Sequence, residues 1–372
     1  MNGQAGSGAQ APGNVQAPDA PAVAVAGRRP RRGWQIAAAL AAAAAISFGV
    51  YAGRHTLAES LDSLTSLNWA WFLAAVAFEA LSITAFGLSR RRLLRADGQR
   101  IGLGSVLAVD MASNALSISV PFAGAQLALV FSYQQYRRRG LGQAITGWAL
   151  AVSAIMSVSA LALVLVGGSL LGGASLTTAL GFAGAAVMLV PGVAILVALR
   201  SPRMRNLISV ALAALTAWAR RVLRRPAPDA VAADGFKEFL ERVASIRMRP
   251  ARYAEVFALA VLNWVGDCAC LACAIHAAGQ PVPWHGLLLA YAAGAAVGST
   301  GLTPGGFGLV EATLTAALVG VGMTSGGALT AVLAYRLCNF WLILIGGWIT
   351  MVVLTRFRSR TATSPGIPAD PG

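Results

Sequence analysis

The residues best suited to chemistry form a glycine-rich break between two apolar stretches. The segment reads Thr303-Pro304-Gly305-Gly306-Phe307-Gly308-Leu309-Val310-Glu311. Unsatisfied backbone N–H and C=O groups are costly in hydrocarbon, so an irregular segment at membrane depth must be buried in protein or line a polar cavity. We expect Thr303 to cap a helix whose first turn holds Pro304 and whose unpaired N–H groups receive a phosphate. The alternative is that the glycines only allow close helix packing, as we expect for Gly294 and Gly298.

Ionisable side chains inside the apolar runs form a second candidate set, namely Glu79, Asp110, Asp267, Glu311 and Arg336. Each costs roughly 2.5 to 3.5 kcal/mol on insertion scales if it faces lipid, so we expect these side chains to face one another or a cavity. Glu79 and Asp267 lie at similar depths in corresponding spans. Together with Glu311 they are candidates to set the polarity of a cavity or to carry protons.

Arg336 is the sole cation of this set. A guanidinium offers bidentate geometry to phosphate, so Arg336 is a candidate to bind an anionic head group. Buried charges usually need a protein partner, however, and Glu311, Asp267 and Glu79 are all available. The sequence leaves both alternatives open.

Composition places the chain in a membrane. Of its 372 residues, 57% are hydrophobic and 12% are charged, which is typical of a polytopic membrane protein. Runs long enough to cross roughly 30 Å of hydrocarbon predict six full spans, at 34–51, 69–88, 144–166, 179–199, 254–278 and 328–354.

Two further apolar segments are interrupted. Residues 103–133 break at 121–125, beside Pro121, and residues 286–323 contain the glycine-rich break. Each arm is too short for an untilted span, so we predict two re-entrant helix pairs that enter from opposite faces and whose tips meet near the midplane. The order of span, broken pair and span occurs twice. The predicted fold is therefore an all-α membrane bundle with an inverted repeat, equivalently described as up to ten helical segments.

The net charge of +15 does not indicate nucleic-acid binding, because the basic residues flank the apolar runs and no basic patch is interleaved with aromatics. The positive-inside rule places both termini in the cytoplasm. We expect residues 1–33 to be a disordered tail, 34–355 to be the transmembrane domain and 356–372 to be a cytoplasmic tail. Residues 200–252 are predicted to form a cytoplasmic amphipathic insert, which lies along the inner leaflet or on the protein's own surface.

Enzyme and metal signatures are scarce. Cys268, Cys270 and Cys273 share one apolar run, and Cys338 lies in another. Their positions favour packing over metal binding, since no partner lies at zinc spacing. The glycine-rich break lacks the Gly-Lys-Ser/Thr of a nucleotide loop, and no metalloprotease or nucleophile-elbow motif occurs. We therefore expect no catalytic activity, no cofactor and no metal.

Residues 304–311 resemble the Pro-Gly-Gly-x-Gly-x-x-Glu segment of the lysylphosphatidylglycerol synthetase transmembrane-region family of flippase-like bacterial membrane proteins. The resemblance extends in hydropathy and spacing over residues 34–354. It includes a proline-containing break near an Asn, here Pro121 and Asn114. The family often carries an Arg-x-Gly-Glu type sequence at this break, whereas the segment that ends at Gln126 supplies no charge.

The resemblance implies a stand-alone form without the soluble synthetase domain, in the bacterial cytoplasmic membrane. Our leading hypothesis is a lipid flippase that passes an anionic or zwitterionic head group, including aminoacylated ones, through a cavity formed by residues 121–126 and 299–311. The membrane lipid would be its partner. One alternative is a membrane protein that organises an envelope-lipid enzyme, with residues 200–252 as the docking face. An intramembrane transferase is the least supported.

Overall fold

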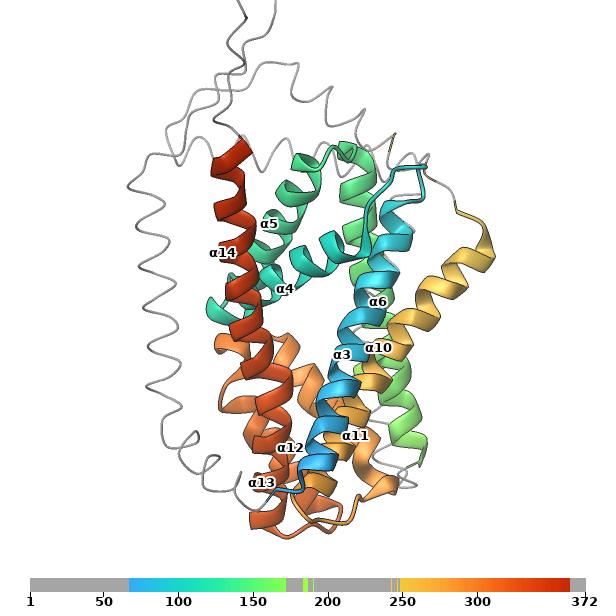
Figure 1. The fold of residues 1–372 in the computed structure, drawn as a ribbon. Coiled ribbons are helices and arrows are strands. Elements are labelled where there is room, and N and C mark those ends of the chain that lie inside the picture. Colours follow the sequence, from blue (N-terminus) through green and yellow to red (C-terminus); the bar gives the residue numbers. More distant parts are fainter. Residues whose placement is uncertain are drawn as a thin grey trace, which may run out of the picture. The chain divides into compact units, whose positions relative to one another are not determined.

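Every regular element described by the computed structural model is a helix (Figure 1). The structure describes residues 67–171, 183–186, 190, 242, 246 and 248–361, with side chains described up to residue 355. Within this part, four helices are long and apolar enough to cross a membrane: Trp69–Leu94, Gln143–Leu171, Pro250–Ala277 and Ser325–Thr355. They match four predicted spans. The other two predicted spans, the predicted N-terminal tail, and most of the predicted C-terminal tail and insert lie outside the continuously described ranges.

Helices α3 (Trp69–Leu94) and α10 (Pro250–Ala277) pack together as an antiparallel pair. The side-chain oxygen of Asn68 accepts hydrogen bonds from the first backbone N–H groups of α3, which defines where the helix begins. The backbone N–H of Asn68 donates to Ala277 at the end of α10 (2.9 Å). At the opposite end, Arg92 and Glu255 form an ion pair of 2.6 Å. The two helices are thus joined at both ends.

The first broken pair consists of α4 (Leu103–Ser119) and α5 (Gly124–Arg138). The break covers residues 120–123, close to the predicted 121–125. The Tyr136 hydroxyl near the end of α5 donates to Asp110 of α4 (3.1 Å), so α5 returns along α4. A buried cluster also joins Tyr136 to Leu93 at the end of α3 and Val256 at the start of α10. The predicted hairpin, rather than a single crossing, is confirmed for this segment.

The second broken pair consists of α11 (Trp284–Ser299) and α12 (Leu309–Gly320), with the short 3-10 turn η1 (Pro304–Gly306) between them. The predicted helix start at Thr303 holds only for the single 3-10 turn η1, in which Pro304 takes the first position. The Thr303 hydroxyl makes no cap hydrogen bond, and the regular helix begins five residues after Pro304, at Leu309. The reason is the left-handed backbone of Gly305 (φ 56°) and Gly308 (φ 80°), which ends helical geometry before a second turn forms.

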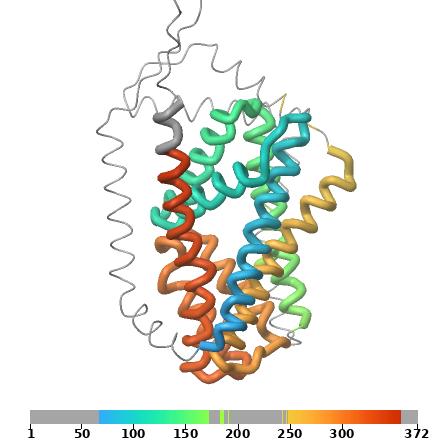
Figure 2. The backbone as a smooth tube through the Cα atoms, viewed as in Figure 1, coloured from blue at the N-terminus to red at the C-terminus, as the bar shows by residue number. Residues whose placement is uncertain are grey.

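The last span joins α13 (Ser325–Arg336), the π-helical segment η2 (Leu337–Leu342) and α14 (Ile343–Thr361). Helix α14 packs on α4, and α6 (Gln143–Leu171) packs on α11. Both contacts use a glycine. A Cβ atom added at Gly347 would lie 2.6 Å from Ala115 Cβ, and one at Gly168 would lie 2.7 Å from the Leu289 nitrogen. Figure 2 shows α4 and α5 in the upper half of the bundle and α11 and α12 in the lower half.

Small residues also let α12 approach α11. A Cβ atom added at Gly294 would lie 2.6 Å from the Leu314 side chain, and one at Gly298 would lie 3.2 Å from Val310. The packing role predicted for this glycine pair is confirmed. The four cysteines are free and buried in one core cluster with residues of α10, α11 and α13, so the prediction that they pack in the core is also confirmed.

Candidate functional site

A cavity of about 530 Å³ lies where the two broken helix pairs meet, between α3, α10 and α13. Its lining combines apolar side chains with buried polar and charged groups. The buried charged groups are Glu79, Asp110, Asp267 and Arg336, and the half-buried amides of Asn114 and Asn339 lie beside them. Ionisable groups at this depth are expected to mark a substrate or ion pathway, so the cavity is the candidate site.

Most of the sequence-predicted site residues line this cavity, namely Glu79, Asn114, Gln126, Asp267, Thr303, Gly305, Gly306 and Arg336. Four of them do not contribute to the lining: Pro121, Pro304, Gly308 and Glu311. The two prolines shape the breaks themselves. Gly308 and Glu311 instead form a hydrogen bond with each other, and Glu311 pairs with Arg336.

The two hairpin tips touch, as predicted. The backbone N–H of Phe122 donates to the carbonyl oxygen of Gly301 (3.0 Å). Phe122 has a left-handed backbone (φ 58°), which is an outlier for a bulky residue. With its amide nitrogen facing the turn, Gln126 donates to the carbonyls of Phe122 and Ala123 (3.2 Å each). The tip of the first hairpin is therefore held in an unusual conformation at the wall of the cavity.

Asp267 is the centre of a buried hydrogen-bond cluster. Its Oδ2 accepts from the Tyr291 hydroxyl (2.8 Å), and its Oδ1 accepts from the Tyr335 hydroxyl (2.9 Å) and the Asn339 amide (3.0 Å). Tyr335 and Asn339 are four residues apart, so one helical face presents both donors. Hydrogen bonds from three donors stabilise negative charge on a buried carboxyl group.

Glu79 lies beside this cluster. Glu79 is only 6% exposed, and its Oε2 atom has no hydrogen-bond partner among the described residues. The Glu79 and Asp267 side chains interact directly with each other. The cavity therefore contains two adjacent buried carboxyl groups, only one of which is surrounded by donors.

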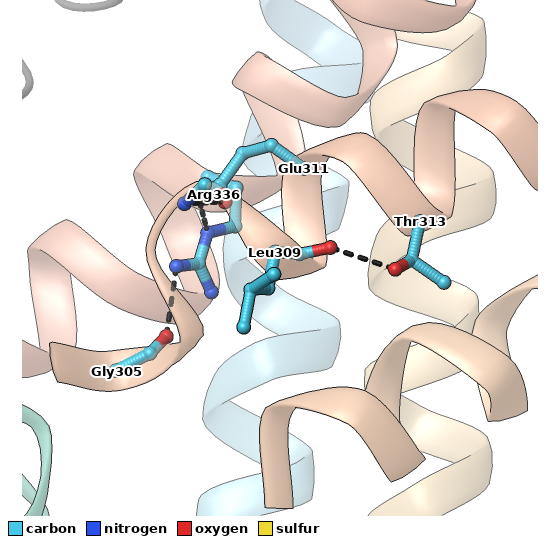
Figure 3. A network of polar contacts seen from close by, with 6 residues as sticks. Gly305, Leu309, Glu311, Thr313 and Arg336 are labelled. Carbon is cyan, nitrogen blue, oxygen red and sulfur yellow. Dashed lines mark hydrogen bonds and ion pairs between the residues drawn. The ribbon is translucent and has the colours of Figure 1, made fainter. Parts of the chain in front are cut away.

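Arg336 and Glu311 tie the glycine-rich break to α13 (Figure 3). Arg336 Nε donates to Glu311 Oε1 (2.6 Å), and Arg336 Nη2 donates to the carbonyl oxygen of Gly305 (2.9 Å). Glu311 Oε2 accepts from the backbone N–H of Gly308 (2.7 Å). The guanidinium also lies over the Phe340 ring, 4.5 Å from its centroid. Of the two alternatives for Arg336, an anionic head group or a protein partner, the structure shows the protein partner, Glu311.

This network also shows which group lies at the N-terminus of the helix that follows the break. Glu311 is in the first turn of α12, where its carboxylate caps the helix and balances the positive end of the helix dipole. The helix N-terminus is thus already occupied by an internal anion. The Pro-Gly-Gly-x-Gly-x-x-Glu segment forms a closed structural unit in which Glu311 binds the break on one side and Arg336 on the other.

A third buried cluster was not predicted. Arg90 forms an ion pair with Asp110, which also accepts from Tyr136 (3.1 Å). Arg90 stacks over Phe86, 4.4 Å from the ring centroid. The sequence places Arg90 in a flanking loop, but its side chain is only 12% exposed. Asp110 lines the cavity, and its Oδ2 atom has no partner among the described residues.

These features define a class of protein: a helical membrane domain with two broken helix pairs around a charged cavity. Within that class, residues 34–347 match the family described as the lysylphosphatidylglycerol synthase TM region. The chain belongs to this family, as its glycine-rich break suggested. No curated protein matches the sequence.

Proposed function

We propose that this chain is a lipid flippase, an integral membrane transporter that moves a phospholipid-type lipid between leaflets. The observation that carries the proposal is the cavity at the junction of the two hairpin tips, which contains buried charges from α3, α10 and α13. A polar cavity inside apolar helices offers a head group a path through hydrocarbon. The acyl chains would remain in lipid.

The helix packing supports an inverted repeat. In such a repeat, α3 corresponds to α10, α4 corresponds to α11, and α6 corresponds to the last span, which contains α14. The contact of α4 with α14 in one half then corresponds to the contact of α11 with α6 in the other, and the structure has both contacts. Each contact contains a closely packed glycine, Gly347 against α4 and Gly168 against α11. Opposed hairpins around one central site are the arrangement expected of an alternating-access transporter.

We place this transporter in the inner membrane of a bacterium, with both termini in the cytoplasm. The end of the bundle formed by the last turns of α3 and α5 carries Arg91, Arg92, Arg137 and Arg138. Arg249 and Arg252 lie at the start of α10, whose Glu255 pairs with Arg92. Clustered arginines at one end of membrane helices favour the cytoplasmic side.

Charge in the cavity favours a head group that carries an amine. Arg336 is balanced by Glu311, and Arg90 is balanced by Asp110. Glu79 and Asp267 have no basic partner in the described part of the chain, so the centre of the cavity has excess negative charge. An ammonium group would balance this charge, whereas a head group with only negative charge would be repelled. Zwitterionic and aminoacylated phospholipids fit this requirement, and the proposal includes no catalytic step and no cofactor.

Reconstitution of the full chain tests the proposal. Liposomes would carry a trace of acyl-chain-labelled phosphatidylethanolamine or, in parallel, acyl-chain-labelled phosphatidylglycerol. A membrane-impermeant quencher then reports how much label reaches the outer leaflet. We expect transfer of the amine-bearing lipid above empty liposomes and slower transfer of phosphatidylglycerol. Transfer equal to that of empty liposomes for both lipids, and for an aminoacylated one, would overturn the proposal.

A further inference from the structure

The carboxyl pair at the centre of the cavity has an unequal environment. Asp267 accepts three hydrogen bonds, from Tyr291, Tyr335 and Asn339. Glu79 interacts with Asn339, but its Oε2 atom has no hydrogen-bond partner among the described residues, although Glu79 is only 6% exposed and lines the same cavity. Two adjacent carboxylates in a low-dielectric site repel each other strongly, and one bound proton removes that repulsion.

The position of the proton follows from the donors. A carboxylate with three donors has its negative charge stabilised in place, so Asp267 is the anion. A carboxyl group with one oxygen that lacks a donor gains by holding the proton there, because its O–H can then donate to the neighbouring Asp267. We propose that Glu79 is a proton-binding site, and that its proton exchanges with the ammonium group of the transported head group. The exchange part of this inference rests on the proposed function, whereas the proton site does not.

The other groups that face the pair are consistent with a single proton. Tyr291 on α11 and Tyr335 on α13 act as donors, and Cys270 and Cys338 are buried thiols next to the pair. Arg336 is directed away to Glu311 and Gly305. Within the described residues, Asp267 is the only other carboxyl group that interacts with Glu79, and no cation pairs with either of them.

Charge balance couples the movement of the lipid to the movement of the proton. When an ammonium group enters the cavity, it supplies the positive charge that the proton supplied, so Glu79 can lose its proton to water on that side. When the head group leaves on the other side, Glu79 takes up a proton from that side. The carboxyl pair has the same net charge with the proton as with the ammonium group beside it, so the lipid and the proton move in opposite directions, one for one.

Infrared difference spectroscopy on the purified chain in lipid nanodiscs tests the proton site directly. A buried protonated carboxyl group gives a C=O band that shifts on exchange into D₂O. We expect this band in the wild type and in Glu255→Gln, a matched change at a carboxylate paired with Arg92, and its loss in Glu79→Gln. Gln has the shape of a protonated Glu, so the variant should fold. A band that survives in Glu79→Gln, or its absence from the wild type, would overturn the proton site.

A pH gradient tests the coupling. Liposomes with acyl-chain-labelled phosphatidylethanolamine would be given a gradient of one pH unit, with the membrane potential clamped by potassium and valinomycin. One-for-one exchange drives the labelled lipid to a leaflet ratio of about tenfold, because one pH unit is a tenfold ratio of protons. We expect this ratio in the wild type and in Glu255→Gln, and no response in Glu79→Gln. A wild type that transfers lipid without responding to the gradient would overturn the coupling.

The two experiments separate the two proposals. If the wild type transfers no lipid in any liposome, the flippase proposal and the coupling both fail, while the infrared band still decides whether Glu79 holds a proton. If the band is lost in Glu79→Gln and lipid transfer responds to the gradient only in the wild type and Glu255→Gln, both proposals stand.

Discussion

The backbone N–H of Phe122 donates to the carbonyl oxygen of Gly301 over 3.0 Å. Both residues have a left-handed backbone, with φ of 58° and 64°. The contact joins the turn of the first broken helix pair to the break of the second, at the wall of the cavity. A shift of either hairpin must therefore break or move this bond, so the two hairpins are coupled where the head group is proposed to pass.

Strain at Phe122 gives the first prediction. A non-glycine residue in a sparsely populated backbone region costs about 1 to 3 kcal/mol, and the Phe122 side chain is 73% exposed. We expect Phe122→Gly to raise the unfolding temperature of the purified protein. Phe78→Gly, the same change inside the regular helix α3, should lower the unfolding temperature. Equal losses in the two variants would contradict the prediction.

The ion pair of Arg336 and Glu311 gives the second prediction. Their side chains are 7% and 12% exposed. Removal of one partner from a buried pair costs roughly 3 to 5 kcal/mol, because the other charge stays buried and unpaired. We expect Glu311→Gln and Arg336→Gln each to lower the unfolding temperature strongly. The double variant should recover part of this loss, and a double variant that loses the sum of both effects would argue against a mutual pair.

The glycine contacts give the third prediction. A Cβ at Gly168 would lie 2.7 Å from the backbone of Leu289, whereas one at the adjacent Gly167 would meet only a side chain at 3.8 Å. Overpacking costs about 1 to 3 kcal/mol, so Gly168→Ala should destabilise the protein and Gly167→Ala should not. In the proposed second repeat, Gly347→Ala should likewise destabilise the protein more than Gly346→Ala. Thermal unfolding in detergent measures all four variants, and an equal effect within each adjacent pair would be the contrary result.

Much of the fold is predictable from the sequence, because proline and glycine inside apolar runs are strong signals. They locate both breaks and the hairpin that ends at Arg137–Arg139. The start of α12 is not predictable in the same way. Thr303 and Pro304 form a good local helix start, but the backbone of Gly305 and Gly308 ends the turn.

The charges of the site were predicted, but the sequence left the partner of Arg336 open among three carboxyl groups and did not predict the donors around Asp267. Hydropathy identifies Glu79, Asp267 and Arg336 as charged residues inside apolar runs, but it does not predict which helix faces pack against one another. Tyr291 and Tyr335 look like core aromatics until their hydroxyls are found within 3 Å of Asp267. Arg90 looks like a flanking arginine because its partner Asp110 lies across a loop. Such pairings depend on tertiary contacts that no local pattern contains.

Water access to the cavity gives the fourth prediction. Asn114 is half-buried and lines the cavity, whereas Ala112, two residues earlier on α4, is fully buried outside it. We expect a water-soluble maleimide to modify Asn114→Cys much faster than Ala112→Cys. Mass spectrometry of the modified peptide separates these sites from the native cysteines. Equal slow rates would show that the cavity is closed to water.

The donors around Asp267 give the last prediction. Tyr291→Phe removes one hydrogen bond to a buried carboxylate, which costs about 1.5 to 3 kcal/mol and leaves one oxygen of Asp267 without a donor. We expect a lower unfolding temperature and a smaller response of lipid transfer to a pH gradient, because Asp267 then competes with Glu79 for the proton. Tyr253→Phe is the matched control, since that ring lies on α10 and packs edge-on against Trp148, away from the carboxyl pair. If Tyr291→Phe loses stability yet keeps the full gradient response, the tyrosine is structural only and does not position the charge.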